Sequence, residues 1–261
     1  MKINLVYNKK ISNYSEILSE IESILISKKI DFASFELDCM KNYGDFTVVI
    51  GGDGTLLKAA RFYSNSSVPV LGINIGRLGF LSQGVSNEIN SIIESIKNED
   101  YYIEERLMLS SMDKFALNDF VIKGCDSSRT SKFYLEINGE TVCDYIADGL
   151  IISTPTGSTA YGLSAGGPVV YPTMDAIIVV PICPHTLTAR PLVVPSSEEI
   201  KVMTADRHLA VSVDGFEKME CVEMITIKSA PRKAVLAFLD KRRFYNVLRN
   251  KLHWGISPKA F

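Results

Sequence analysis

The first hundred residues alternate between short apolar runs and longer segments in which apolar side chains recur at helical spacing. Between residues 14 and 29 isoleucines recur every three or four positions, and isoleucines at similar spacing follow Ser86, a residue type that commonly caps helices. Two amphipathic helices are expected there. Apolar, mostly β-branched runs predict strands at residues 2–7, 32–37, 47–50 and 68–73. Strands that alternate with helices in this way predict a parallel, doubly wound α/β sheet.

After Tyr101 the pattern changes to short strands separated by turn residues, and no helical period of useful length returns until near the C-terminus. The clearest hairpin joins residues 133–137 to residues 141–143 through Asn138-Gly139, the dipeptide preferred in two-residue hairpin turns. This part of the chain is therefore expected to form an all-β second domain.

A glycine-rich turn follows the strand predicted at residues 47–50. Gly51-Gly52-Asp53-Gly54-Thr55 stands between that strand and a helical segment. A strand, glycine turn and helix start in this order point free backbone N–H groups and the positive end of a helix at an anion, which suits phosphate. A carboxylate does not bind phosphate, so Asp53 indicates either a base for an attacking hydroxyl or a ligand of Mg²⁺. The structural alternative is a turn aspartate that bonds only to nearby backbone.

A second polar segment interrupts the all-β half. An apolar strand runs into Thr154-Pro155-Thr156-Gly157-Ser158-Thr159-Ala160-Tyr161. The glycine lets backbone approach a ligand closely, the hydroxyls are short donors and acceptors, and the ring of Tyr161 offers a stacking face. These features indicate a polar pocket of nucleotide size.

Polar residues also follow or interrupt other predicted strands. Asn118-Asp119 is an adjacent amide and acid on an apolar strand, and burying both is costly unless they bond to something, so a ligand is the expected partner. Asn74 stands just past the strand at 68–73. Phe80, a few residues later, either lines the pocket or packs in the core.

Composition and charge exclude several classes of protein. The 261 residues carry 28 Lys and Arg against 30 Asp and Glu, a net charge of −2, so there is no basic field to attract nucleic acid or an anionic membrane. No apolar run reaches membrane-spanning length or has the form of a signal peptide. The five cysteines are scattered without a C-x-x-C pair, which argues against disulfides and a zinc site. A cytoplasmic protein that binds neither nucleic acid nor membrane is expected.

The polar motifs occur together in a fixed order: GGDGT, then Asn74-Ile75-Gly76-Arg77-Leu78-Gly79-Phe80-Leu81, then Asn118-Asp119, then TPTGSTAY followed by Gly166-Gly167-Pro168. With this ordered set the chain resembles the bacterial NAD kinases, the ATP-NAD kinase family, over nearly its whole length. GGDG alone also resembles a loop of diacylglycerol kinases and 6-phosphofructokinases, whereas the set that includes TPTGSTAY is specific.

The resemblance implies two domains. The first is an α/β, Rossmann-like domain at residues 1–103, completed by the C-terminal segment 236–261, and the second is an all-β, β-sandwich domain at residues 104–235 that binds NAD. A predicted strand at 235–239 and an amphipathic helix at 244–252 would then pack back on the first domain. A homo-oligomer, either a dimer or a tetramer, is expected.

The resemblance also implies a reaction. It is the transfer of the γ-phosphate of ATP, with polyphosphate as an alternative donor, to the 2′-hydroxyl of the adenosine ribose of NAD, giving NADP. Asp53 would orient and deprotonate that hydroxyl, helped by Mg²⁺ or another divalent metal whose protein ligands the sequence does not assign. The residues expected to hold the donor phosphates are Gly51, Gly52, Gly54 and Thr55.

Further contacts, to NAD, are carried over residue by residue from the same resemblance. Asp148 is expected to bond adenine or ribose, either in its own subunit or in a neighbour's. The family usually carries Glu where this chain has Asp119, so the shorter acid is a departure whose reach is in doubt. The full set comprises Asn74, Phe80, Asn118, Asp119, Asp148, Thr156, Thr159, Ala160, Tyr161 and Ser164.

Three other functions stay open on the sequence. Residues 162–166 match the G-x-S-x-G motif of serine hydrolases, with Asp206 or Asp214 and His253 downstream, although a nucleophile elbow should directly follow a buried strand. The second is a non-catalytic NAD(P) sensor that kept the pocket. The third is a lipid or sugar kinase of the same superfamily.

Overall fold

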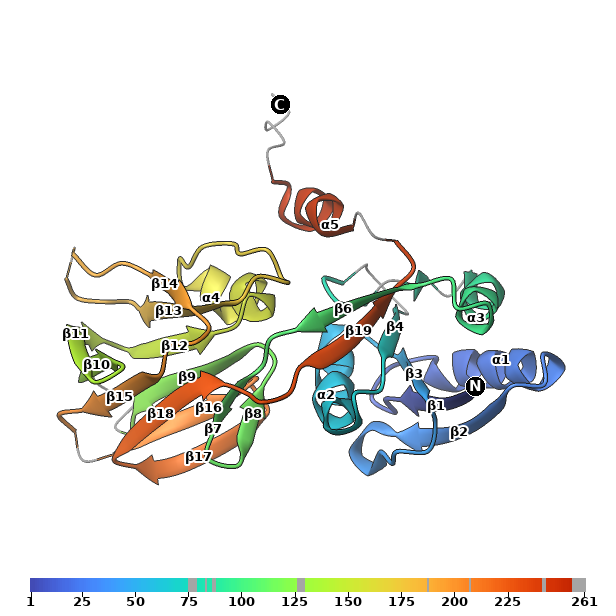
Figure 1. The fold of residues 1–261 in the computed structure, drawn as a ribbon, viewed down its shortest axis with the longest axis horizontal. Coiled ribbons are helices and arrows are strands. Elements are labelled where there is room, and N and C mark those ends of the chain that lie inside the picture. The colour runs from blue at the N-terminus through green and yellow to red at the C-terminus, as the bar shows by residue number, and fades with distance from the viewer. Residues whose placement is uncertain are drawn as a thin grey trace. The chain divides into compact units, whose positions relative to one another are not determined.

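The structure, a computed structural model, divides into two compact units. The first consists of residues 1–105 and 234–261, and the second of residues 106–233. Figure 1 shows the elements of both along the chain. The residues that the structure describes are 1–74, 79–82, 84–85, 88–125, 130–186, 188–206, 208–240 and 243–254. Ser86, expected to cap a helix, and residues 75–78 of the Asn74–Leu81 motif lie outside them.

A seven-stranded sheet forms the centre of the first unit, as far as the described residues show. Its strands are β1 (Lys2–Tyr7), β2 (Asp31–Glu36), β3 (Phe46–Ile50), β4 (Val70–Asn74), β5 (Gly84–Val85), β6 (Tyr102–Arg106) and β19 (Ala234–Phe238). The order is β2-β1-β3-β4-β19-β6, with β5 beside β4. The pairs β1–β2, β1–β3, β3–β4 and β4–β19 are parallel, which confirms the α/β prediction.

Helices cover both faces of this sheet. They are α1 (Tyr14–Ser27) and α3 (Ile89–Lys97) on one face and α2 (Asp53–Tyr63) on the other. The unit also contains the helix α5 (Arg243–Leu252) and the 3-10 turns η1 (Leu37–Cys39) and η2 (Ser64–Ser66). The buried isoleucines of α1 and α3 pack on alternate residues of β1, β3 and β4. Figure 1 shows these helices and strands as ribbons. On the other face, a Cβ added at Gly72 would lie 3.0 Å from Leu56 of α2, so glycine lets α2 approach closely. The carboxyl ends of β1, β3 and β4 therefore meet at one edge, where open α/β sheets bind ligands.

The second unit is a sandwich of two antiparallel sheets. Their strand orders are β11-β10-β15-β18-β7-β8 and β14-β13-β12-β9-β16-β17. The strands are β7 (Leu109–Ser111), β8 (Lys114–Ala116), β9 (Asp119–Gly124), β10 (Ser131–Ile137), β11 (Glu140–Ala147), β12 (Gly149–Ser153), β13 (Ala176–Ile182), β14 (Leu192–Pro195), β15 (Ile200–Thr204), β16 (Leu209–Val213), β17 (Glu217–Val222) and β18 (Met224–Ser229).

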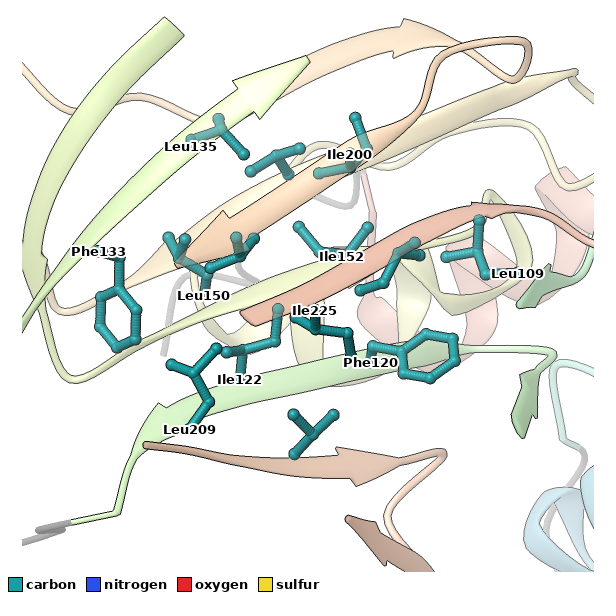
Figure 2. Close-up of a cluster of buried hydrophobic side chains, with 14 of the residues drawn as sticks. Leu109, Phe120, Ile122, Phe133, Leu135, Leu150, Ile152, Ile200, Leu209 and Ile225 are labelled. Atoms are coloured by element: carbon teal, nitrogen blue, oxygen red, sulfur yellow. The ribbon is translucent and has the colours of Figure 1, made fainter. Parts of the chain in front are cut away.

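One apolar core lies between the two sheets. Figure 2 shows Phe120 and Ile122 of β9 on one side and Phe133 and Leu135 of β10 on the other, all fully buried. The β10–β11 hairpin turns at Asn138 and Gly139, whose φ angles of 50° and 81° are those of the expected two-residue turn. The β-sandwich and this hairpin are thus confirmed.

Two short helices in the second unit were not expected from the sequence. They are η4 (Thr156–Thr159) and α4 (Tyr161–Ser164), and together they carry most of the TPTGSTAY motif. Each is a single turn, too short to show a helical period of apolar residues.

Two further observations bear on expectations from composition. Within the described part of the chain, no helix is both long and apolar enough to cross a membrane. The cysteines whose side chains are described, Cys39, Cys125, Cys143 and Cys183, are free thiols.

Candidate active site

The glycine-rich turn of the first unit leaves bare backbone at the start of α2. The N–H of Gly51 donates to the carbonyl of Ile73 at 2.9 Å, which fixes the turn against the end of β4. Gly52 occupies the capping position with extended backbone, and no side chain caps the helix. A Cβ at Gly52 or Gly54 would meet no heavy atom within 4 Å, so side chains there would fill space that is open now. An uncapped helix start with open space above glycine backbone fits a phosphate.

Asp53 makes long-range hydrogen bonds from this turn. Its carboxylate accepts the backbone N–H groups of Phe80 at 2.7 Å, Leu81 at 3.1 Å and Ser82 at 3.1 Å, and the Ser82 hydroxyl at 3.0 Å. A Cβ at Gly79 would lie only 1.8 Å from Oδ1, so glycine is required there. Asp53 is therefore not a turn aspartate bonded to nearby backbone. It holds the segment 79–82 against the phosphate turn.

A cation from the end of the chain joins this cluster. Nζ of Lys251, on α5, lies 3.7 Å from Oδ2 of Asp53 and 4.9 Å from the centre of the Phe80 ring. No sequence pattern indicates this contact, because Lys251 is nearly two hundred residues away and belongs to an ordinary basic helix end.

Two amides support the same edge of the sheet. Asn74, buried at the end of β4, donates to the Ser82 hydroxyl at 3.2 Å, and Asn8, just after β1, donates to the Thr55 hydroxyl at 3.1 Å. Asn8 was not among the candidates. Asn8 directly follows the strand predicted at residues 2–7, and this position predicts that it lies at the ligand-binding edge of the sheet.

A cavity of about 630 Å³ lies within the second unit, over β9, β16 and β17. Four predicted residues line it: Asn118, Asp119, Ala160 and Tyr161. Tyr161 is 41% exposed, and its ring can stack on a flat ligand. The structure thus brings together residues that lie some forty positions apart in the sequence.

Asp214 positions the turn that carries Asn118 and Asp119. Its carboxylate accepts three successive backbone N–H groups, from Leu117 at 3.0 Å, Asn118 at 2.7 Å and Asp119 at 3.0 Å. Asp119 is 4% exposed. Burial, and then the neighbouring Asp214 charge, raise the pKa of Asp119 to about 7. The sequence indicates Asp214 only as a possible member of a hydrolase triad and does not predict this positioning role.

Most of the TPTGSTAY hydroxyls support the loop itself. Thr154 donates to the carbonyl of Leu117 at 2.6 Å, Ser158 to that of Pro155 at 2.7 Å and Thr159 to that of Thr156 at 3.4 Å. The hydroxyl of Thr156 is buried and accepts a hydrogen bond from Arg106 at 3.3 Å.

Gly157 has a different role from the one expected. A Cβ there would lie 2.2 Å from the carbonyl oxygen of Asn118, so glycine lets this loop pack on the Asn118 turn. The close approach is to protein backbone, and the expectation of close approach to a ligand is corrected.

Asp148 and Ser164 stand apart from the cavity. Asp148 is exposed between β11 and β12, at the opposite end of β12 from the TPTGSTAY loop, and Ser164 is exposed at the end of α4. Neither lines the cavity that contains Asn118 and Tyr161.

Comparisons with known proteins follow the same division of the chain. The model of the ATP-NAD kinase N-terminal domain matches residues 6–101, and the model of the ATP-NAD kinase C-terminal domain matches residues 117–237. The chain belongs to the ATP-NAD kinase family. Phosphorylation of NAD to NADP is the activity that this membership assigns to it. The serine hydrolase alternative is therefore rejected.

Curated relatives and solved structures agree. An NAD kinase from Azotobacter vinelandii is 41% identical over 225 residues, 81% of this chain and 76% of that protein. One from Heliobacterium modesticaldum is 42% identical over 224 residues, 81% of this chain and 79% of that protein.

Among solved structures, an NAD kinase from Archaeoglobus fulgidus in complex with ATP is 26% identical with a TM-score of 0.80, over 97% of this chain and 99% of that chain. Yeast NADH kinase complexed with NADH is 24% identical with a TM-score of 0.87, over 100% of this chain and 90% of that chain. At that identity the second likeness shows the fold alone.

Proposed function

We propose that the chain transfers the γ-phosphate of ATP to the 2′-hydroxyl of the adenosine ribose of NAD. In this proposal the first unit, at residues 1–103 with 236–261, holds the donor, and the second, at residues 104–235, holds NAD. The observation that carries it is the position of Asp53, whose carboxylate stands at the first turn of α2 directly beside open glycine backbone. An acid and a phosphate site in contact are what phosphoryl transfer to a hydroxyl requires.

The phosphate turn supplies backbone and dipole. Free N–H groups at the start of α2 would hold donor oxygens, and the helix dipole would favour their negative charge. Thr55, buried and bonded to Asn8, keeps the turn in shape and also explains Gly51, where a Cβ would lie 2.7 Å from the Thr55 side chain.

Asp53 would accept the proton of the ribose hydroxyl. Both of its oxygens are engaged by the segment 79–82, so the hydroxyl must share an oxygen with one of these donors or replace it. The segment therefore fixes the direction from which the substrate reaches the carboxylate.

The described residues do not form a metal cage. They contain no group of three or more His, Cys, Asp or Glu side chains that could hold an ion. Mg²⁺ commonly binds through one or two carboxylates together with phosphate oxygens and water, so Asp53 is the protein ligand available beside the phosphate turn. When bound, the ion would neutralise charge on the donor phosphates.

In the second unit Asn118 and Asp119 would bond the adenosine of NAD, and Tyr161 would stack on it. Asp148 and Ser164 would act on the ligand of a neighbouring subunit, which fits their exposure away from the cavity and a homo-oligomer, either a dimer or a tetramer. The cytoplasmic location stays a prediction.

The test is NADP formation from NAD, ATP and Mg²⁺ by the purified protein, with polyphosphate as a second donor. Asp53→Asn should lower turnover by about 100-fold or more while NAD binding persists. Asp38→Asn is the matched control, because Asp38 is an exposed acid of the same unit that pairs with Lys58. NAD binding without turnover in the unsubstituted protein would favour the sensor alternative.

A further inference from the structure

The outer face of one sandwich sheet is covered over only part of its width. Over β12 and β13 it packs against the chain that follows α4, where Val170 and Ala165 belong to one apolar cluster with Val180 and Ile182. Over β9, β16 and β17 the same face lines the cavity of the second unit. This open part is where a ligand can lie against the sheet.

The strand register places two lysines on this open face. Lys123 of β9 pairs with Ala210 of β16, and Lys218 of β17 pairs with Ser212 of β16. Directly paired residues point to the same face, and Ala210 and Ser212 are two positions apart, so all four share one face. Both lysines line the cavity, with two small side chains between them. The small side chains of Ala210 and Ser212 make the cavity deeper over β16, and the two lysines lie on either side of this deeper part.

The charges of the cavity change from acidic to basic along β9, with Lys218 level with Val121. Asp119 and Asp214 lie at the end where β9 begins, and Lys123 lies four strand residues further along, about 13 Å away. Lys123 and Lys218 are exposed, and neither has an ion-pair partner among the described residues. Acids with an amide at one end, a cation level with Val121 and a second cation beyond it suit a ligand with a nucleoside at one end and phosphates beyond it.

We infer that Lys123 and Lys218 form a subsite for the pyrophosphate of the dinucleotide whose adenosine is bound by Asn118, Asp119 and Tyr161. The inference rests on the proposed function for the identity of the ligand. Two ammonium groups with long stems hold a pyrophosphate as point charges without fixed geometry. Substrate affinity, not the chemical step, is what they supply.

The experiment measures binding by calorimetry with adenosine, ADP-ribose and NAD as probes in the absence of ATP. ATP alone is titrated separately, and the sedimentation coefficient of each variant is recorded. The double variant Lys123→Gln/Lys218→Gln should weaken ADP-ribose and NAD by about 10- to 100-fold and adenosine by less than about 2-fold, because only the first two carry phosphates. The salt dependence of NAD binding should fall as well. Lys123→Arg/Lys218→Arg should keep affinity near that of the unsubstituted protein.

Lys201→Gln is the matched control. Lys201 is a strand lysine of the other sheet, paired with Glu136 at 3.1 Å, and its loss should leave all three affinities unchanged.

Three results would overturn the inference. One is an equal loss for adenosine and ADP-ribose. Another is a loss of ATP affinity with NAD affinity kept, which would give the lysines to the donor. The third is unchanged affinity with an altered sedimentation coefficient, which would show that a second copy of the chain covers this face. Because binding is measured without turnover, these results are independent of whether the kinase assay succeeds.

Discussion

Two carboxyl groups of the second unit show how environment separates residues of the same type. Asp214 accepts three backbone N–H groups, whereas Asp119, one of the residues it positions, is buried beside it. The sequence placed Asp119 in the binding site from its apolar neighbours. It did not connect Asp119 with Asp214, which lies 95 residues further along the chain.

Asp119→Asn should change how stability depends on pH. The pKa of Asp119 is raised to about 7 in the folded protein from 3.8, so its contribution is fully present below pH 3.8 and is lost as the pH rises through 7. Asparagine does not ionise, so the variant does not lose stability in this way. Between pH 5 and pH 8 its free energy of unfolding should rise by about 2 kcal/mol relative to that of the unsubstituted protein. Urea unfolding at both pH values measures it. Asp148→Asn, at an exposed site, should show no such gain. The prediction would be contradicted if the unfolding free energies of Asp119→Asn and the unsubstituted protein changed with pH in parallel.

Alanine substitution at two glycines of the predicted site should affect different properties, stability at Gly157 and ATP affinity at Gly54. Gly157→Ala places a methyl 2.2 Å from the Asn118 carbonyl and should cost about 2–4 kcal/mol of unfolding free energy. Gly54→Ala enters open space and should change stability by less than about 1 kcal/mol, while ATP affinity falls because the methyl occupies the phosphate position. Chemical denaturation and ATP titration of both variants separate the roles. Equal stability losses would show that both glycines serve packing alone.

At the scale of elements, the strand–turn–helix around Asp53 depends on a segment that no local pattern predicts. Residues 79–82 follow β4, yet their backbone N–H groups bond to the start of α2, and α5 adds Lys251 from the end of the chain. The exposed Lys251–Asp53 pair contributes little to stability by itself. The pair matters because it places the ammonium group of Lys251 beside the carboxylate of Asp53.

Gly79→Ala should uncouple this segment from Asp53. The added Cβ would lie 1.8 Å from Oδ1, so the segment must move away and the carboxylate loses its orientation. Turnover should fall by about 10-fold or more with NAD affinity within about 2-fold, as expected for a positioning effect. In the double variant with Asp53→Asn the two losses should not add.

Ser82→Ala is the milder control for the same segment. It removes one side-chain bond to Asp53 and keeps three backbone bonds, so its effect on turnover should be several-fold smaller. Additive losses in the Gly79→Ala/Asp53→Asn cycle would show that the segment acts independently of the carboxylate.

At the scale of the whole molecule, both ends of the chain build the first unit. β19 enters its sheet beside β4, so the second unit is inserted between β6 and β19. An oligomer in which Asp148 serves a neighbour's site would extend this sharing from segments to subunits.

Mixing two inactive variants tests that arrangement. In a mixed dimer of Asp53→Asn and Asp148→Ala subunits, one site carries both substitutions and the other carries neither. Random mixing should therefore restore about a quarter of the turnover of the unsubstituted protein. Each variant alone, unfolded and refolded in the same way, is the control. No recovery in demonstrably mixed oligomers would place Asp148 with its own subunit's ligand or outside the site.

The sequence by itself determined the α/β and β-sandwich classes, the β10–β11 hairpin and the family. These depend on periodicity, turn chemistry and short motifs, which are local, and on the order of the motifs, which is read directly along the chain. Only the tertiary structure decided what each polar residue contacts. Gly157 packs on Asn118, Asp53 holds residues 79–82, and Asp214 positions Asp119 across 95 residues. Strand order and register determine these contacts, because they bring distant segments of the chain together. A local sequence pattern does not predict which distant segments will meet.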